Sequence, residues 1–326
     1  MIEILLKEWI ERVKYYIHLI ADYSIKESQV GAVLDDVLNL SGKMLRSKLL
    51  LLCAFLGSNW KNNKEKICKL AAMVELTHLA SLIHDDIVDD SPYRRGKVSI
   101  QGKYGKDAAV FAGDFLIARI FYYGAVENLN EAVSILSKTV EYMCIGEIEQ
   151  DLCRYQEDIS EKKYFENIER KTAALFQAAS YIGAKETGCS EEIIQKLKLF
   201  VKNLGLMFQL KDDILDFTSN SKELGKETHK DFQNGIYTFP VIMALKNPKA
   251  REVLLPIMRK NKEEKLSLAE ILQLQSYIIQ FGGIEASYEK IKYLSTINRQ
   301  LIKELGQNSK ITVYLEKILN DLEVKK

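Results

Sequence analysis

The chain has 326 residues, of which 47% are hydrophobic and only four are proline, and no linker rich in proline, glycine or serine divides it. It is therefore expected to form one domain over residues 1–326 around a single large core. A net charge of +1 provides no overall field that would attract nucleic acid. Five cysteines, odd in number and without a C-x-x-C pair, indicate reduced thiols in a cytoplasmic protein, not disulfides or a zinc site.

No membrane-spanning or secretory segment is expected. The longest uninterrupted apolar run, 49–56, is too short to span a bilayer. Asp114 and Arg119 interrupt the apolar stretch around 108–126. The N-terminus lacks the basic segment followed by a hydrophobic one that a signal peptide would have.

Apolar residues recur at helical period along most of the chain, and alternating patterns typical of strands are scarce. This periodicity predicts an all-α fold, a single large helical bundle. The expected helices are 1–23, 29–39, 43–57, 65–88, 106–128, 130–152, 160–183, 190–216, 234–246, 248–260, 267–281, 283–305 and 310–322.

An acidic cluster, HDDIVDD at 84–90, ends the fourth of these helices. Asp85 and Asp89 lie four residues apart and so share one helix face. Two carboxylates one turn apart repel each other, and burying them unpaired costs free energy, so a cation is expected between them. Oxygen ligands on a rigid face suit Mg²⁺, which commonly completes its coordination with phosphate oxygens.

Two arginines follow the cluster at once in SPYRRG, 91–96. Pro92 ends the helix, and Arg94 and Arg95 place two permanent positive charges beside the carboxylates. Acidic residues for the metal and arginines for the phosphate suggest a site for a magnesium diphosphate. The alternative is a solvated acidic helix end, which charge clusters usually are.

A second copy of the pattern, QLKDDILD at 209–216, follows the apolar run 200–210. Two D-D-x-x-D helices, far apart in sequence, can face each other across one cavity. Chance recurrence of the whole pattern is a poor explanation, so the pair favours the metal-diphosphate interpretation.

With these two motifs the chain resembles the trans-polyprenyl diphosphate synthases, the head-to-tail enzymes that elongate isoprenoid chains. The resemblance extends from about Gly42 to Ala244. It implies an isoprenoid synthase-like bundle with a central cavity, and a homodimer to which a small accessory subunit can be added. The implied reaction condenses isopentenyl diphosphate with an allylic diphosphate and depends on Mg²⁺, with three ions at each site.

The resemblance also assigns roles to individual residues. The implied metal ligands are Asp85, Asp89 and Asp212, and the aspartates in supporting roles are Asp86, Asp213 and Asp216. The implied contacts of the allylic diphosphate are Arg94, Lys171, Thr172, Gln209 and Lys226. The implied contacts of isopentenyl diphosphate are Lys43, Arg46, His78 and Arg95.

Several of these residues also have plainer interpretations. Lys43 and Arg46 belong to GKMLRS at 42–47, which is expected to open a helix whose backbone N–H groups favour an anion, although a helix start with solvent-reaching basic side chains would look the same. A lone histidine such as His78 is more often a satisfied core residue, and Lys171 fits a surface lysine.

One loop departs from the pattern of the family. The family usually has G-K-P-x-G-x-D, whereas this chain has GKETHKD at 225–231. Lys226 and Asp231 are retained, but Glu227 replaces the proline and His229 replaces the second glycine. Because glycine adopts backbone angles that histidine avoids, the loop must close differently.

Ala80 and Ser81, about one turn before Asp85, are expected to leave a path open for the growing tail. An isoprene unit spans about one helical turn, so each unblocked turn admits about one more unit. The product is therefore predicted to be a medium- or long-chain polyprenyl diphosphate, hexaprenyl to octaprenyl. The floor of the path is expected on the 130–152 helix, at Leu136, Val140 or Met143.

Four alternatives stay open. The two small residues could serve helix packing alone, with a short farnesyl or geranylgeranyl product. The chain could be the catalytic subunit of a two-component synthase. A class I terpene cyclase would need an N/D-D-x-x-S/T-x-x-x-E second motif, which Asp212, Asp213 and Asp216 do not fit. A non-catalytic scaffold subunit would be expected to have lost some of the aspartates.

Overall fold

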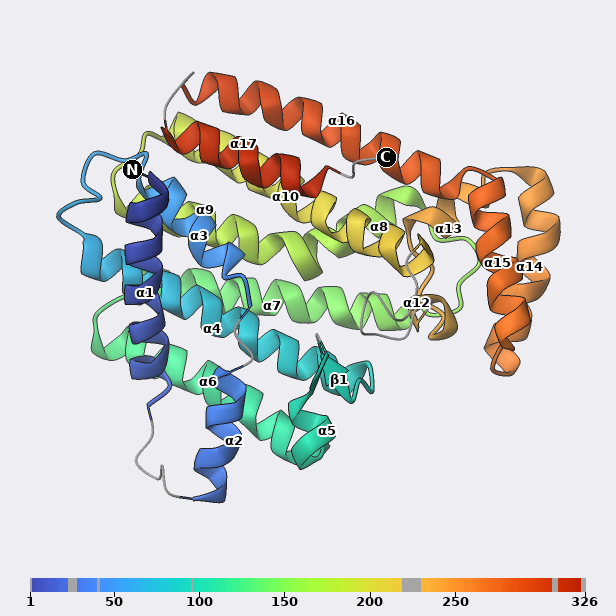
Figure 1. Cartoon of the computed structure of the whole chain (residues 1–326), viewed down its shortest axis with the longest axis horizontal. Coiled ribbons are helices and arrows are strands. Elements are labelled where there is room, and N and C mark those ends of the chain that lie inside the picture. The colour runs from blue at the N-terminus through green and yellow to red at the C-terminus, as the bar shows by residue number, and fades with distance from the viewer. Residues whose placement is uncertain are drawn as a thin grey trace. The chain divides into compact units, whose positions relative to one another are not determined.

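The computed structural model describes residues 2–22, 28–39, 42–94, 96–218, 230–306 and 310–323, and its regular elements are helices apart from one small hairpin (Figure 1). The all-α prediction is confirmed. In the first half of the chain the elements are α1 (Ile2–Ile20), α2 (Gln29–Leu38), α3 (Leu45–Ala54), α4 (Lys64–Val88), β1 (Tyr93–Arg94), β2 (Lys97–Val98), α5 (Ile100–Tyr104), α6 (Lys106–Val126) and α7 (Asn130–Leu152).

The second half continues with helices, one of which begins with a π-helical turn. The elements are α8 (Glu161–Ile168), η1 (Glu169–Ala173), α9 (Ala174–Glu186), α10 (Glu191–Thr218), α12 (Lys230–Gln233), α13 (Phe239–Ala244), α14 (Pro248–Glu263), α15 (Leu268–Gln280), α16 (Gly283–Glu304) and α17 (Lys310–Leu322).

The chain divides into two compact units. Unit 1 comprises Met1–Val140, Leu175–Leu199 and Asn308–Ile311, and unit 2 comprises Glu141–Ala174, Phe200–Gln307 and Thr312–Lys326. Each unit brings together segments that are distant in sequence. The single domain over 1–326 and its central cavity stay predictions.

Helix α4 is the centre of unit 1, where it packs against α1, α3, α5 and α6. Its residues are apolar on all sides over most of its length, as expected of a helix that is surrounded by others. A buried carboxylate fixes α3 to it: the Ser47 hydroxyl donates to Glu75 Oε2 at 2.9 Å and to the Ala71 carbonyl at 3.0 Å. These contacts hold the helix that carries the first aspartate motif.

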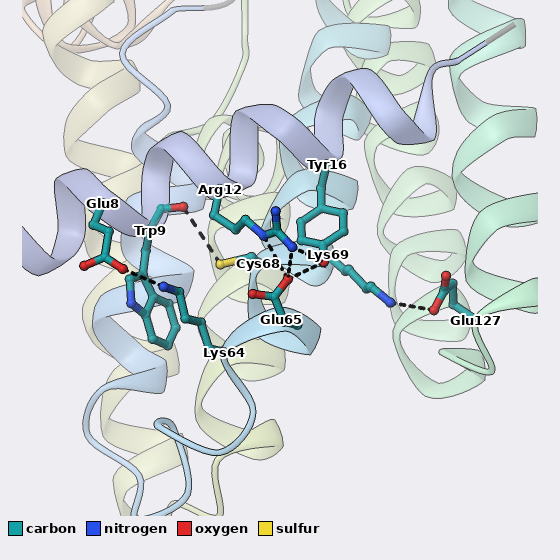
Figure 2. Close-up of polar contacts among 9 residues, drawn as sticks. All are labelled: Glu8, Trp9, Arg12, Tyr16, Lys64, Glu65, Cys68, Lys69 and Glu127. Atoms are coloured by element: carbon teal, nitrogen blue, oxygen red, sulfur yellow. Dashed lines mark hydrogen bonds and ion pairs between the residues drawn. The ribbon is translucent and has the colours of Figure 1, made fainter.

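Polar contacts fasten α1 across the first turns of α4 (Figure 2). The guanidinium of Arg12 donates to Glu65 Oε2 at 2.6 Å through Nη2 and at 2.8 Å through Nε, and the Tyr16 hydroxyl donates to the same oxygen. Lys69, one turn further along α4, reaches Glu127 at the end of α6 at 2.6 Å. The start of α4 is thus tied to both neighbouring helices.

In unit 2, α13 packs against α8, α15 and α16, and asparagines join α10 to α16. Asn203 Nδ2 donates to Asn298 Oδ1 at 2.9 Å, and Asn298 Nδ2 donates to the Phe200 carbonyl at 3.0 Å. Both side chains are buried, so satisfying their polar atoms fixes the register between the two helices.

The expected 160–183 helix is interrupted, which corrects the sequence prediction. It consists of α8, the π-helical turn η1 and α9. Two glycines let neighbouring helices approach η1: a Cβ on Gly146 would lie 2.9 Å from Lys171 N, and one on Gly205 would lie 2.7 Å from Ala173 Cα. Single π-turns are frequent at functional sites, and this one carries Lys171 and Thr172.

Three other expectations need correction. The helix expected at 43–57 begins at Leu45, because Met44 before it is left-handed with φ of 51°. The helix expected at 234–246 is only the short α13, preceded by an extended Thr238. The stretch after α4 folds into the antiparallel β1–β2 pair, which helical periodicity does not predict.

By length and composition alone α4 and α6 are each long and apolar enough to cross a membrane, a test that the core helix of a soluble protein also passes, so the expectation of no membrane-spanning segment stays a prediction. Asp114 and Arg119 are too few charges to exclude α6 by this criterion. In the 18-residue apolar stretch of α4, 72% is buried inside the protein, as expected of a core helix. In the corresponding stretch of α6, only 39% is buried. α6 therefore leaves much apolar surface uncovered.

We predict that Glu65→Gln lowers the urea midpoint of unfolding at pH 7. The hydrogen bond from Arg12, and then that from Tyr16, lower the pKa of Glu65 below its ordinary value of about 4.5. A lowered pKa stabilises the fold above the unfolded-state value, and that stabilisation is lost as pH falls through the folded-state value. The difference between wild type and variant should therefore close in acid.

The matched control is Glu11→Gln, which removes an exposed α1 carboxylate that pairs with Lys14 three residues away. A single ion pair within one helix contributes little, whereas Glu65 accepts hydrogen bonds from two side chains of another helix, so the Glu11→Gln midpoint should stay near wild type at every pH. A Glu65→Gln midpoint equal to wild type at pH 7 would contradict the role given to the α1–α4 contacts.

Candidate active site

The three aspartates of the first motif differ in their surroundings. Asp85 and Asp89 at the end of α4 are half-buried, and the backbone N–H of Asp89 donates to the Asp85 carbonyl at 2.9 Å, so one helical turn separates them. Asp86 between them is only 2% exposed. The expected shared face of Asp85 and Asp89 therefore remains accessible, while Asp86 points into the protein.

Asp86 is compensated by Arg94 from the hairpin. Arg94 Nε and Nη2 each lie 2.7 Å from Asp86 Oδ1, and both side chains are largely buried. Gln101 Nε2 donates to the Asp86 carbonyl at 2.6 Å, and the Ser99 hydroxyl donates to the Ser91 carbonyl at 2.7 Å. The hairpin is thus folded back on the end of α4, with a permanent cation beside its buried aspartate.

Arg95, the second arginine of this stretch, lies outside the described residues. Its predicted contact with isopentenyl diphosphate stays a prediction. The guanidinium of Arg94 carries five N–H groups. The ion pair with Asp86 uses two of its nitrogens, so the remaining N–H groups are possible donors to a phosphate.

The residues expected to bind isopentenyl diphosphate also lie in unit 1. Lys43 is exposed and precedes α3, so the expectation that it opens this helix together with Arg46 is wrong. Arg46, in the first turn of α3, places its guanidinium 4.6 Å from the centre of the Phe176 ring on α9. This cation–π contact fixes the position of the guanidinium. His78 is half-buried on α4, two turns before Asp85.

Of the two residues predicted to border the tail, Ala80 is fully buried and Ser81 is half-buried. The Ser81 hydroxyl donates to the carbonyl of His78 at 2.8 Å, so its polarity is satisfied within the helix. Ser81 consequently presents a small, nearly apolar surface one turn before Asp85. Among the floor candidates, Leu136 is fully buried, and Val140 and Met143 are half-buried.

The second motif, in unit 2, repeats the arrangement of the first. Asp212 is exposed and Asp216 is half-buried, whereas Asp213 is only 1% exposed. Both oxygens of Asp213 accept hydrogen bonds: Oδ2 from the Tyr164 hydroxyl at 2.5 Å and Oδ1 from Gln209 Nε2 at 2.9 Å. Asp213 thus turns inward, as Asp86 does.

The buried pair has strongly altered acidities. Burial raises the pKa of Asp213 to about 7, although the hydrogen bonds from Tyr164 and Gln209 act in the opposite direction. Burial, and then the charge of Asp213, raise the pKa of Tyr164 well above its ordinary range. The tyrosine therefore stays protonated and remains the donor.

Lys171 and Thr172 on η1 lie close to acidic and amide groups of unit 2. Lys171 Nζ is 2.9 Å from Glu147 Oε1 and 3.0 Å from Glu147 Oε2 on α7, with both side chains about three-quarters buried. The Thr172 hydroxyl donates to Gln209 Oε1 at 2.9 Å. The structure therefore brings together Thr172 and Gln209, both predicted contacts of the allylic diphosphate, and the supporting aspartate Asp213.

The loop that carries Lys226, Glu227 and His229 lies outside the described residues, so the predicted contact of Lys226 and the altered closure remain predictions. Asp231 at the end of that pattern is described and starts α12 together with Lys230. Its negative charge lies close enough to raise the pKa of Asp213 further.

In neither unit do the described residues include three His, Cys, Asp or Glu side chains that are close enough together to hold a metal. The donor set nevertheless fits a hard cation that needs few protein ligands. Each motif offers carboxylates four residues apart at a helix end, and Mg²⁺ commonly takes one or two carboxylates and completes its shell with water and phosphate. In each motif the middle aspartate is already occupied by protein donors.

Sequence reasoning missed Tyr164, Glu147, Gln101 and Glu75. Tyr164 lies 49 residues from the aspartate to which it donates, so no spacing connects the two. Glu75 is a single acid in a helical stretch, and Glu147 is one of several acids at 147–151, so both look like surface residues. A usable signal was the pair of glycines, Gly146 and Gly205, which mark a close approach of two helices to one turn.

Comparison with known proteins agrees with these features. The polyprenyl synthetase family matches residues 27–275. Heptaprenyl diphosphate synthase component 2 from Geobacillus stearothermophilus is 34% identical over 265 residues, which cover 80% of each chain. Polyprenyl synthase from Caulobacter crescentus CB15, solved with calcium and isoprenyl diphosphate, is 29% identical with a TM-score of 0.87, over 98% of this chain and 96% of that one.

Heptaprenyl diphosphate synthase from Staphylococcus aureus is 26% identical, with a TM-score of 0.86 over 98% of each chain. These likenesses confirm the resemblance inferred from the two aspartate motifs, the isoprenoid synthase-like fold and the class of reaction. The chain belongs to the polyprenyl synthetase family and is a prenyltransferase.

Proposed function

We propose that the chain condenses isopentenyl diphosphate with an allylic diphosphate in the presence of Mg²⁺ to make an all-trans product of six to eight isoprene units. The observation that carries the proposal is the common arrangement of the two motifs. In each, the middle aspartate is buried against protein donors, Arg94 for Asp86 and Tyr164 with Gln209 for Asp213. Asp85 and Asp89 are half-buried and Asp212 is exposed, so a ligand can reach these three aspartates.

Asp85, Asp89 and Asp212 would hold the metal, with Asp216 in support. Bound Mg²⁺ would supply Lewis-acid stabilisation of the leaving diphosphate, worth several kcal/mol. The number of ions, three, is part of the proposal and follows from the family resemblance. The Caulobacter relative, solved with calcium and isoprenyl diphosphate, supports a divalent cation beside a diphosphate.

Protein cations would do the rest of the charge compensation. Lys171 and Lys226, with the free N–H groups of Arg94, would bind the allylic diphosphate and stabilise the charge that develops on it. Lys43, Arg46, His78 and Arg95 would hold isopentenyl diphosphate so that its double bond faces the allylic carbon. Such positioning can contribute about 7–11 kcal/mol at most.

No protein nucleophile is needed, because the double bond of isopentenyl diphosphate forms the new carbon–carbon bond. Loss of a proton to the released diphosphate would restore an allylic product for another round. The protein must keep water away from the allylic cation, and the apolar, largely buried helix α4 suits that requirement.

We predict that Asp85→Asn lowers kcat at least about 100-fold, since losing several kcal/mol of charge stabilisation costs more than two factors of ten. Asparagine keeps the size of the side chain but not its charge. Turnover of the wild type should cease in EDTA and return with added Mg²⁺. The measurement is the rate of incorporation of labelled isopentenyl diphosphate into allylic product.

The control for this variant is Asp158→Asn, which removes an exposed carboxylate that pairs with Arg251 on the surface. Its kcat should match that of the wild type. Full activity of the wild type in chelator, or of Asp85→Asn without it, would refute the metal mechanism.

The product length is proposed from Ser81 and from the relatives. Ser81 presents a small surface on the accessible side of α4, whereas a large side chain there would obstruct a tail. The Geobacillus and Staphylococcus relatives are named heptaprenyl diphosphate synthases, within the range of six to eight units. The alternative is a short-chain product, for which Ser81 would be small only to allow packing.

We predict that Ser81→Phe shortens the main product by about one or more isoprene units, because the ring would occupy the turn above Asp85. Products made from farnesyl and isopentenyl diphosphates would be sized by mass spectrometry. Thr296→Phe, on the exposed side of α16, adds the same ring elsewhere and should leave the length unchanged. Wild-type products that end at four units would overturn the proposed length.

We further propose that α6 forms a homodimer interface. Phe111, Tyr122 and Val126 on its outer side are exposed by 71%, 61% and 60%, and at spacings of eleven and four residues they lie within about 60° of one another. An apolar stripe of this kind needs a partner surface. A second copy is the simplest one, since most soluble oligomers are two-fold symmetric.

We predict that the double variant Phe111→Asp/Tyr122→Asp sediments as a single chain while the wild type sediments as two. Charges at the centre of an apolar interface lose hydration without gaining partners. Val313→Asp, on the exposed side of α17, is the matched control and should remain dimeric. A monomeric wild type, or a dimeric double variant, would contradict the assignment of this face.

An accessory subunit remains part of the proposal. The Geobacillus relative is named component 2, which suggests a two-component synthase in that organism. Turnover by the purified chain alone would establish that it needs no second component. We propose a cytoplasmic location, in support of which all five cysteines are free thiols.

A further inference from the structure

Four side chains of unit 2 form one continuous chain of hydrogen bonds. It runs from the Tyr164 hydroxyl on α8 to Asp213 on α10, from Gln209 to the same carboxylate, and from Thr172 on η1 to Gln209. The resemblance to the family assigns roles to three of these residues but none to Tyr164. Tyr164 nevertheless occupies the end of the chain that lies deepest in the protein.

The hydrogen bonds of Gln209 have defined directions. Its NH₂ group donates to Asp213 Oδ1 and its carbonyl oxygen accepts from the Thr172 hydroxyl, which is the arrangement that an ionised Asp213 favours. The Thr172 hydroxyl must then donate its proton to Gln209. One N–H of the Gln209 amide is left over, and the half-buried position of this side chain lets that N–H face a ligand.

Tyr164 is held rigidly enough to impose this order. Its ring packs edge-on against Phe165 at 5.1 Å between centroids and in a tilted arrangement against Phe239 at 5.5 Å, and it is almost fully buried. The Lys290 ammonium on α16 lies 4.6 Å from the centre of the Phe165 ring and so contacts the aromatic group that holds Tyr164. The hydroxyl is consequently fixed in place, and its 2.5 Å bond sets the rotamer of Asp213.

We propose that Tyr164 is a positioning residue for the allylic diphosphate: through Asp213 it orients the amide of Gln209 and the hydroxyl of Thr172. This inference rests on the proposed function of the site. Without the tyrosine hydroxyl, one oxygen of the buried Asp213 loses its donor, the carboxylate can rotate, and Gln209 can turn its amide over. The N–H offered to the diphosphate is then lost for part of the time.

The test is Tyr164→Phe, which removes the hydroxyl and keeps the ring. The KM for farnesyl diphosphate should rise about tenfold, as expected for the loss of one well-placed hydrogen bond, while the KM for isopentenyl diphosphate stays within about twofold of wild type. The control is Tyr237→Phe, which removes a buried hydroxyl of the same unit that donates to the Met258 carbonyl and should change neither constant.

A double-variant cycle shows whether the change in KM at Tyr164 is transmitted through the hydrogen bonds to Thr172. Combining Tyr164→Phe with Thr172→Val should raise the KM for farnesyl diphosphate by less than the product of the two single effects, because both changes disturb the same amide. When Tyr237→Phe is combined with Thr172→Val, the rise in KM for farnesyl diphosphate should equal the product of the two single effects. Should Tyr164→Phe fail to fold by circular dichroism, Asp213→Asn carries the same test, because its amide keeps an oxygen for Tyr164 but presents an NH₂ group to the Gln209 amide.

Unchanged KM for farnesyl diphosphate in Tyr164→Phe, equal rises for both substrates, or a multiplicative cycle in an active enzyme would overturn this inference alone. A wild-type chain that neither turns over nor binds farnesyl diphosphate in calorimetry would overturn the proposed function and the positioning role together, since no allylic diphosphate would then be bound.

Discussion

A carboxylate removed from water needs donors or a cation beside it, because an unpaired buried charge costs several kcal/mol. Both aspartate motifs of this protein place one member, Asp86 or Asp213, under that constraint. Each is nearly fully buried, and each is compensated by residues from another element, the β1–β2 hairpin in one case and α8 in the other. The compensation in turn fixes the helix ends on which the outer aspartates sit.

Two irregular features of the fold can be understood from this constraint. The hairpin brings Arg94 back to Asp86, which an extension of α4 beyond Pro92 would not have done. The π-turn η1 places Thr172 in reach of Gln209 and Lys171 in reach of Glu147. In both places the backbone departs from a regular α-helix near the residues that are proposed to bind diphosphate.

The aspartate motifs and the long helices could be predicted from the sequence, because periodicity and local spacing determine them. The helix at 130–152 was predicted with the bounds that α7 has, and that at 65–88 differs from α4 by one residue. The partners of the buried aspartates could not be predicted in this way. Arg94 was expected to face phosphate, but only the hairpin register shows that it also neutralises Asp86. Tyr164 meets Asp213 only through tertiary packing.

The π-turn and the start of α3 were missed for a local reason. Helical propensity does not distinguish a π-turn from a continuous α-helix, and here the turn depends on close contacts at Gly146 and Gly205 of other helices. At the start of α3, Met44 adopts a left-handed conformation that methionine rarely takes and that no residue pattern announces. Lys43 therefore lies in the loop before α3 and not in the helix.

The central claim is that the outer aspartates bind metal while the middle ones are reserved for protein contacts. The most direct measurement is a crystal structure with Mn²⁺ and a non-hydrolysable allylic thiodiphosphate, in which anomalous scattering locates each ion. The account predicts ions coordinated by Asp85, Asp89 and Asp212, with Asp86 still bonded to Arg94 and Asp213 still bonded to Tyr164. Direct coordination of an ion by Asp86 or Asp213, with those bonds broken, would contradict it.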